Sequence, residues 1–383
     1  MTLRPATVDE VREMVVEHAG RRVPLRIAAR GTWLDAGRPV EGATRLDVSA
    51  LSGVVEYTPG DLTLTARAGT PLGELTALTR ANGQFLPLDP WGGDDGSLGA
   101  TIATATAGPR AGGGSGGRGL PRDVVLGVEF VDGRGRVARG GGRVVKNVAG
   151  FDLVRMQTGA WGTLGVLTEV SVRLSALPER DETVALATGG DPASFDATLA
   201  SLRERAWSAA ACELVNGNLA KRLGVGDAPM ALVRLAGNDA AVRAMRAIVS
   251  GLGDTRDVPA SVWDALRRSD RGAQVVVRFS APPASLGGVW RAAATLSHEQ
   301  GDMHASVARG VVRCLLADVD ADALHRVRRG LNAGYVFERL DATRWNDGHT
   351  APAAPSGRLG TALLDAFDPA RVLNRGIIHP GPA

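Results

Sequence analysis

The sequence predicts an α+β protein of two domains, because its pattern changes near residue 177. Before that point, short alternating strands and capped helices surround a glycine-rich middle. After it, strands and helices follow one another in an order that suits an antiparallel sheet with helices on one face. The chain has 383 residues, too many for one ordinary core. We therefore expect an N-terminal domain over 1–176, a second α+β domain over 177–345 and a C-terminal segment over 346–383.

The composition is that of a soluble globular protein, with 44% hydrophobic and 22% charged residues. The net charge is only +3, and the basic residues are scattered, so we expect no nucleic-acid surface. No run of about 18 apolar residues occurs in the sequence, and the first residues lack the apolar core of a signal peptide. These features predict a cytoplasmic protein that reaches a membrane only through a partner.

The N-terminal elements follow from capping and alternation. Thr7 predicts the start of a helix, because Glu10 three residues later completes a capping box. A second helix is expected to begin with Thr70 as its cap and Pro71 in its first position. Between the two helices, apolar residues alternate with polar ones in short runs, which predicts strands over 23–28, 46–48, 54–57 and 62–68.

Glycine is concentrated in the middle of the chain. The sequence holds 50 glycines, about twice the usual share, and many of them lie between Gly92 and Gly165. A small-residue helix is expected over 98–107, and strands over 124–131 and 136–145 are joined by a hairpin turn. The turn Gly162-Thr163-Leu164-Gly165 then leads into a strand over 166–174 whose alternate residues are apolar.

These glycines do not form a Rossmann fingerprint. That motif needs a helix after its glycines to meet a pyrophosphate, and here a strand follows them. Three other short loops have the composition of anion-binding turns, in which successive backbone N–H groups point to one side. They are Ala29-Arg30-Gly31-Thr32, Ser97-Leu98-Gly99-Ala100 and Gly108-Pro109-Arg110. Taken alone, each of these loops is better explained as an ordinary turn.

The second domain is predicted to consist of alternating strands and helices. Strands are expected over 183–187, 211–215, 229–235, 274–279, 308–315 and 334–338. Helices are expected over 192–206, 239–251, 286–300 and 320–331, with a further helix over 359–367 near the C-terminus.

The sequence contains no motif for a metal site or for a catalytic nucleophile. The six histidines are scattered without ligand spacing, so no metal site is expected. Cys212 and Cys314 lie far apart and are expected to be buried thiols. No G-x-S-x-G elbow occurs, which argues against hydrolysis by a serine nucleophile.

Taken together, several ordered motifs resemble the flavoproteins with a PCMH-type, vanillyl-alcohol-oxidase-like FAD-binding domain, and most of all the FAD-binding subunit of bacterial glycolate oxidase. The strongest are Val145-Lys146-Asn147-Val148-Ala149-Gly150-Phe151-Asp152-Leu153 and Gly162 to Glu169, supported by Ala68-Gly69-Thr70-Pro71-Leu72 and Gln84 to Pro90. Near the C-terminus, Phe367 to Asn374 also fits the family pattern. The resemblance implies a two-lobed FAD-binding domain, a cap or substrate domain, and a C-terminal segment that returns to the first domain.

The resemblance implies non-covalent FAD, because no His or Cys stands where covalent members attach their flavin. It places the pyrophosphate on backbone N–H groups of two loops. It places the isoalloxazine ring, the ribose and the adenine against other segments of the chain. The implied cofactor-binding residues are Arg30, Gly31, Thr32, Pro87, Leu88, Asp89, Leu98, Gly99, Ala100, Gly108, Asp123, Gly162, Thr163, Gly165, Val166 and Leu167. Lys146 and Asn147 are distinctive of the subgroup, and we expect them to be structural.

The implied activity is oxidation of a small 2-hydroxy acid by a FAD-dependent subunit, with electrons passed to a partner. Such a site needs a cation for the carboxylate and a base for the hydroxyl. Weak candidates are Arg278, His304, Arg309 and Arg313. A sister flavoprotein subunit and an iron–sulfur subunit are the implied partners. A stand-alone flavin alcohol dehydrogenase or oxidase, and a non-catalytic or weakly flavin-binding partner subunit, remain alternatives.

Overall fold

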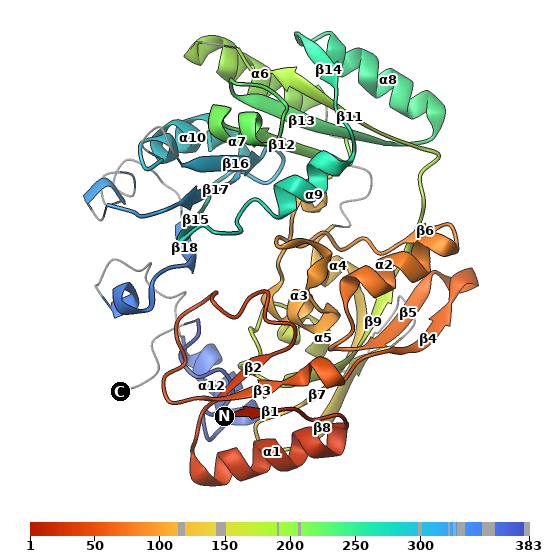
Figure 1. Ribbon diagram of the computed structural model, residues 1–383. Helices are drawn as coiled ribbons and strands as arrows, with labels where there is room; N and C mark the ends of the chain where they lie inside the picture. The colour runs from red at the N-terminus through yellow and green to blue at the C-terminus, as the bar shows by residue number, and fades with distance from the viewer. Residues whose placement is uncertain are drawn as a thin grey trace. The chain divides into compact units, whose positions relative to one another are not determined.

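The computed structural model describes residues 1–113, 119–142, 151–189, 191–205, 208–297, 301–320, 322–324, 327, 334–346 and 357–378. The described chain forms two compact units (Figure 1). The first unit comprises Met1–Ala107, Leu120–Leu177 and Pro352–Ala383, and the second comprises Gly108–Gly119 and Pro178–Ala351. Lys146 and Asn147, the distinctive pair of the sequence, lie outside the described residues.

A small parallel sheet opens the first unit. Strands β1 (Thr2–Leu3), β3 (Thr44–Asp47) and β2 (Leu25–Ala28) lie side by side in that order. Helix α1 (Val8–Arg21) begins as predicted, with the Thr7 hydroxyl accepting from the Glu10 N–H. Its buried residues, Val11 and Val15, join Leu25 and Leu46 in one apolar cluster that anchors β2. The start of the loop after β2 is therefore fixed by packing.

A five-stranded antiparallel sheet forms the centre of the first unit. Its order is β4 (Val54–Thr58), β5 (Thr63–Arg67), β9 (Val166–Arg173), β7 (Val125–Val131) and β8 (Val137–Gly141) (Figure 1). The alternation predicted for 166–174 is confirmed, since Val166, Thr168, Val170, Val172 and Leu174 are all buried. Strand β9 lies in the middle of the sheet, which fixes the glycine turn that precedes it.

Short helices pack on this sheet. They are α2 (Leu72–Ala81), α3 (Leu98–Thr104), α4 (Pro121–Val124) and α5 (Leu153–Gln157), and β6 (Gln84–Phe85) pairs with β10 (Ser175–Ala176). The predicted cap of α2 is wrong by one residue. Pro71 occupies the cap position, and the Thr70 hydroxyl instead donates to Arg67 O. Thr70 is fully buried, and its local hydrogen bonds compete with capping.

The second unit is built on an eight-stranded antiparallel sheet, as predicted (Figure 1). The strand order is β14 (Thr255–Asp257), β11 (Arg180–Ala187), β13 (Met230–Gly237), β12 (Ala211–Val215), β16 (Asp302–Ser306), β17 (Val311–Leu316), β15 (Val275–Ser280) and β18 (Gly334–Arg339). Helices α6 (Pro192–Arg205), α8 (Asp239–Ser250) and α10 (Leu286–Ala294) share one apolar core with this sheet. The sheet therefore buries one face against helices.

The strand predicted over 308–315 is confirmed as β17, and its hairpin partner β16 was not predicted. Strands β16 and β17 meet at a turn in which Gly310 has a φ of 65°. The first of the two strands was missed because the run Asp302 to Ser306 contains too few apolar residues to alternate clearly. Helices α7 (Gly217–Arg222) and α9 (Ser261–Arg267) were also missed, and most of the helix expected over 320–331 lies outside the described residues.

Residues 108–119 interrupt the first unit and belong to the second, although the sequence placed them in the first domain. The 3-10 turn Pro109–Gly112 packs on β12. A Cβ added at Gly113 would lie 2.3 Å from Ala210 O, so only glycine fits this approach. Arg110 pairs at 3.5 Å with Asp181 of β11, which anchors the segment further.

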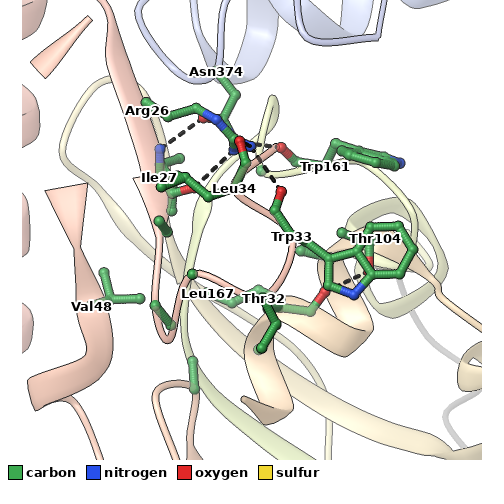
Figure 2. Close-up of a pocket in the computed structure, with 18 of the residues that line it drawn as sticks. Arg26, Ile27, Thr32, Trp33, Leu34, Val48, Thr104, Trp161, Leu167 and Asn374 are labelled. Carbon is green, nitrogen blue, oxygen red and sulfur yellow. Dashed lines mark hydrogen bonds between the residues drawn. The ribbon is translucent and has the colours of Figure 1, made fainter. Parts of the chain in front are cut away.

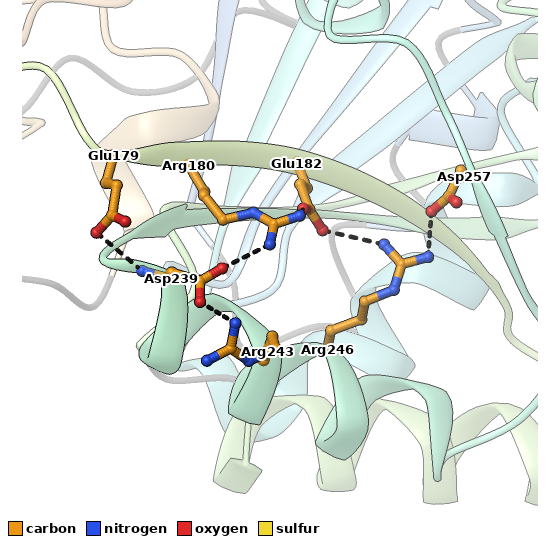
Figure 3. A network of polar contacts seen from close by, with 7 residues as sticks. All are labelled: Glu179, Arg180, Glu182, Asp239, Arg243, Arg246 and Asp257. Carbon is orange, nitrogen blue, oxygen red and sulfur yellow. Dashed lines mark hydrogen bonds and ion pairs between the residues drawn. The ribbon is translucent and has the colours of Figure 1, made fainter.

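Ion pairs tie the start of β11 to α8 and β14 (Figure 3). Arg180 pairs with Asp239 at 2.6 Å and also with Glu182, and Arg246 reaches Glu182 at 3.1 Å and Asp257. The adjoining surface hollow of about 400 Å³ is lined by three arginines and three carboxylates, Arg180, Arg243, Arg246, Asp181, Glu182 and Asp257, so its charges balance. Exposed pairs of this kind contribute little to stability.

Ser97→Ala tests how α3 is held. Ser97 is fully buried, and its hydroxyl accepts from the Ala100 N–H at the start of the helix. Loss of this cap is expected to lower the free energy of unfolding by about 1 kcal/mol, and Ser97→Gly by only a few tenths. Urea unfolding followed by circular dichroism measures both. Equal losses for the two variants would contradict the capping role.

Candidate cofactor site

A pocket in the first unit gathers segments that are far apart in the sequence (Figure 2). Its walls come from β2 and the loop after it, from α3, from the glycine turn before β9, and from the C-terminal segment. The lining residues are Arg26, Ile27, Ala28, Ala29, Gly31, Thr32, Trp33, Leu34, Val48, Ala68, Gly99, Ala100, Ala103, Thr104, Trp161, Gly162, Gly165, Leu167 and Asn374. Its enclosed volume is about 70 Å³. Sites for whole drug-sized ligands enclose about 300–1,000 Å³, so the pocket holds only one part of a dinucleotide.

The loop after β2 offers free backbone donors. Gly31 has a φ of 79°, which favours glycine, and the loop turns back through a bond from Leu34 N to Gly31 O. Among the described residues, the N–H groups of Gly31, Thr32 and Trp33 donate to no protein acceptor. Successive free N–H groups in a turn form a nest that binds anions. This loop therefore has the donor set that a phosphate requires.

Arg26 fixes the shape of that loop from behind. Its guanidinium donates to the carbonyl oxygens of Ile27 at 3.1 Å, Trp33 at 3.1 Å, Leu34 at 3.2 Å and Ala36 at 3.4 Å. With these carbonyls bound to one cation, the loop keeps its N–H groups for other partners. No local sequence pattern indicates this role, because every contact depends on the folded loop.

The pocket has a positive charge close to it. Burial, and after it the neighbouring charge of Arg45, lower the pKa of Arg26 to about 10, so Arg26 remains a cation at neutral pH. Arg45 donates to Ala29 O at 3.4 Å and lies beside Asp47 at 3.3 Å. Two guanidinium groups near one loop favour an anionic ligand.

Helix α3 contributes a wall, and the role expected of its N-terminus must be revised. The N–H groups of Leu98 and Gly99 donate to Thr70 O and Ala68 O, and that of Ala100 to the Ser97 hydroxyl. These donors are used inside the protein, so we do not assign them to a pyrophosphate. A Cβ at Gly99 would lie 2.6 Å from Ala68 Cβ, which shows how closely α3 packs on the sheet.

The glycine turn before β9 forms the opposite wall. Gly162 has a φ of 69°, and a Cβ there would lie 3.0 Å from Asn374 Nδ2 and 3.2 Å from Ile27 Cδ1. Trp161 N donates to Ala103 O at 2.8 Å, which ties the turn to α3. The indoles of Trp161 and Trp33 meet edge to face with centroids 6.1 Å apart.

The structure gathers some of the predicted cofactor residues at the pocket and leaves others away from it. Those that line it are Gly31, Thr32, Gly99, Ala100, Gly162, Gly165 and Leu167. Arg30, Pro87, Leu88, Asp89, Leu98, Asp123, Thr163 and Val166 do not line it, and Gly108 belongs to the second unit. The Arg30 side chain donates to Asp95 O at 2.7 Å.

The candidate catalytic residues lie in the second unit, where three of them share one face of the sheet. His304 and Arg313 are cross-strand neighbours on β16 and β17, and Arg313 is paired in the same way with Arg278 on β15. Arg313 donates to Glu338 at 2.8 Å and to Asp270 at 3.2 Å, while Arg278 lies 3.0 Å from Glu338. We name these residues, with Glu213, the buried polar cluster.

Arg309 lies apart from the cluster, in the turn between β16 and β17. Its Cγ would lie 3.5 Å from a Cβ added at Gly112, so the turn packs against the inserted segment. Three of the four candidates therefore come together and one does not.

His304 is neutral in this cluster. Burial, and then the positive charge of Arg313, lower the pKa of His304 well below its usual value. His304 Nδ1 lies 3.3 Å from Glu213 Oε2, and Nε2 lies 3.4 Å from Arg313 Nη1. A neutral ring in this setting donates from Nδ1 and accepts at Nε2. The ring thus links a buried carboxylate to a buried guanidinium.

The described residues show neither a metal site nor a membrane span. No group of three His, Cys, Asp or Glu side chains there has the geometry to hold a metal ion. None of the described helices combines the length and the hydropathy needed to cross a bilayer. Cys212 and Cys314 are both buried, as expected, and burial raises the pKa of Cys314 to about 12. Such thiols are unreactive at neutral pH.

Comparison with known proteins agrees with this site. A family model described as an FAD binding domain matches residues 1–141. The chain is 33% identical over 375 residues to the glycolate oxidase subunit GlcE of Escherichia coli K12, covering 96% of each chain. It is 32% identical over 188 residues to the glycolate oxidase subunit GlcD of Bacillus subtilis, which is 48% of this chain and 38% of that relative.

Among solved structures, p-cresol methylhydroxylase superposes with a TM-score of 0.74 at 16% identity, over 99% of this chain and 88% of that one. This likeness shows the fold. Fold, pocket and family model together define an FAD-linked oxidoreductase of the PCMH type. Within that class, the chain belongs to the family of the glycolate oxidase subunit GlcE. The predicted family, fold class and cofactor are therefore confirmed.

The residues present fit FAD. The free N–H groups of Gly31 to Trp33 and the positive charge of Arg26 suit the diphosphate, and the apolar walls suit the adjoining parts of the cofactor. The enclosed volume limits this to one portion of FAD, and the rest must extend beyond the pocket.

Gly31→Ala tests the anion-binding turn. The φ of 79° costs a residue with a side chain about 1–2 kcal/mol, so FAD affinity is expected to fall about 5- to 30-fold. Fluorescence titration with FAD measures this. Gly42→Ala is the matched control, because Gly42 has a φ of 65°, open surroundings and no place in the pocket. If both variants bound FAD equally, the assigned role of Gly31 would be wrong.

A pH series tests the neutral state of His304. Its pKa is lowered by folding, so below about pH 6.5 the unfolded chain takes up a proton that the folded chain does not. Stability is thus fully present above that pH and is expected to fall by up to about 1.4 kcal/mol per unit below it. His304→Gln should remove this part of the slope in urea unfolding. An unchanged slope would show that His304 is not its source.

Proposed function

We propose that this chain is the FAD-binding subunit of a glycolate-oxidase-like dehydrogenase, which oxidises a small 2-hydroxy acid and passes the electrons to a partner subunit. The observation that carries the proposal is the end-to-end similarity to GlcE, at 33% identity over 96% of both chains. Similarity confined to the cofactor domain would support only a flavoprotein. Here it extends through the second unit, where substrate is bound in our proposal.

The residues of the first unit would hold the cofactor. The N–H groups of Gly31 to Trp33 would donate to its diphosphate, with Arg26 holding the loop and adding positive charge. When bound, FAD supplies an acceptor for the two electrons of an alcohol oxidation. The chain itself would position the cofactor, place polar groups around it and exclude water.

The partner subunits follow from what this chain lacks. A chain with two cysteines, both buried, does not carry the four thiolates of an iron–sulfur cluster. An iron–sulfur relay would therefore lie on another polypeptide. The word "subunit" in the names of both glycolate oxidase relatives supports a sister flavoprotein subunit as a further partner.

A second candidate function is favoured by the buried polar cluster. A substrate carboxylate needs a cation that is not already neutralised, yet Arg313 is 1% exposed and pairs with both Glu338 and Asp270. His304, as a neutral link between Glu213 and Arg313, is not placed to act as a base. In this alternative, the chain binds FAD and relays electrons, while a sister subunit oxidises the substrate.

Reconstitution separates the two. The FAD-loaded chain is assayed with glycolate or D-lactate and an artificial acceptor, first alone and then with its sister flavoprotein and iron–sulfur subunits. In the first proposal we assign the substrate carboxylate to Arg278, whose side chain is 33% exposed. Turnover should then require the complex and fall at least about tenfold in Arg278→Ala, since that charge-assisted contact is lost. Arg271→Ala, on an exposed turn, is the control. Unchanged turnover in the Arg278 variant would favour the relay alternative.

A further inference from the structure

The C-terminal segment forms a parallel β-bridge to β2 at the single residue pair Leu25 and Leu373. Leu25 N donates to Val372 O at 2.7 Å, and Asn374 N donates to Leu25 O at 2.9 Å, in a parallel arrangement around Leu373. Val372 and Leu373 are buried in the same apolar cluster as α1 and β2. The segment is therefore held by its backbone and its apolar side chains, independently of what the Asn374 side chain does.

The Asn374 side chain makes two further contacts that cross the pocket wall (Figure 2). Its Oδ1 accepts from Ile27 N at 2.7 Å, and its Nδ2 donates to Trp161 O at 2.6 Å. The residue is 3% exposed and has a φ of 42°, a conformation that asparagine and glycine tolerate best. One amide thus uses both its acceptor and its donor on backbone groups from two different segments.

Ile27 N and Trp161 O lie close in sequence to the two proposed cofactor-binding turns. Ile27 leads within four residues to Gly31, and Trp161 directly precedes Gly162. A Cβ at Gly162 would lie 3.0 Å from Asn374 Nδ2, so the glycine allows the amide to approach the turn. Ile27, Trp161, Gly162 and Asn374 all line the pocket.

We propose that Asn374 is a positioning residue for FAD, whose side-chain amide holds the Gly31 turn and the Gly162 turn at the separation that the cofactor needs. The C-terminal segment is then part of the cofactor site, far from residues 1–141 that match the FAD binding domain model. A purely structural role predicts something different. Because the backbone pairing of residues 372–374 survives without the side chain, such a role would leave FAD affinity unchanged in any variant that folds.

Two substitutions separate these roles. Asn374→Gly keeps the left-handed backbone and removes the amide, and Asn374→Asp keeps the acceptor for Ile27 N but replaces the donor to Trp161 O with a second acceptor. Both are expected to raise the Kd for FAD by about tenfold or more, the effect of one lost buried hydrogen bond. The visible circular dichroism of the bound flavin should change as well. Asn82→Gly, at the exposed end of α2, is the matched control and should bind FAD as the wild type does.

Each outcome of these binding measurements either supports or overturns the role proposed for Asn374. Weaker FAD binding by a folded Asn374→Gly protein, with little change in Tm, supports the proposal, and a Kd within twofold of wild type overturns it. If neither variant folds, hydrogen exchange on the wild-type chain replaces them. FAD must then slow exchange of the Ile27 amide relative to the amides of α1, and equal exchange with and without FAD refutes the proposal.

Discussion

A single half-buried guanidinium organises the region on which the rest of the cofactor site depends. Arg26 binds four carbonyl oxygens of residues 27–36, which leaves the intervening N–H groups for a ligand. The Arg26 guanidinium shapes the loop by hydrogen bonds to its carbonyl oxygens. Additional glycines would instead shape a loop through their conformational freedom. The positive charge of Arg26 also favours the anion that the loop receives.

The two units use their charges in contrasting ways. In the first, Arg26 donates to backbone carbonyls, and burial and then the charge of Arg45 lower its pKa against the opposing effect of Asp35, while Arg45 pairs with Asp47 at 3.3 Å. The positive charge of Arg26 therefore favours an anion at this loop. In the second, Arg313 and Arg278 are matched by Glu338 and Asp270, and His304 remains neutral between them. Buried charges that satisfy one another give a rigid sheet face, and they leave little unbalanced charge for a substrate. This contrast is the structural reason for carrying two proposals about where substrate oxidation takes place.

Much of the fold could be predicted from the sequence where local patterns decide it. The alternation of β9 and the Thr7 cap of α1 depend on neighbouring residues, and both are confirmed, although the Glu10 carboxylate accepts from Ala6 N and not from the Thr7 N–H of a complete capping box. Gly31 and Gly162 were also recognisable, because glycine is the residue that adopts a positive φ at least cost. Arg26 and Asn374 could not be found in this way. Asn374 contacts Ile27 across 347 residues of sequence, and no local pattern reports such a meeting. The N–H groups of α3 failed as predicted donors for a similar reason, since their acceptors, Thr70 and Ala68, come from another segment.

Because residues 108–119 belong to the second unit, no single cut divides the chain into its two units. The chain passes between its two units four times, at 107/108, 119/120, 177/178 and 351/352. A cut at the apparent boundary near residue 177 would leave Gly113 without Ala210 and Arg110 without Asp181. It would also remove the C-terminal segment that bridges to β2 at Leu373. Neither half is a transferable module. Exchange of substrate domains between relatives by simple fusion would therefore have to preserve the inserted segment and the C-terminal segment together with the domains they serve.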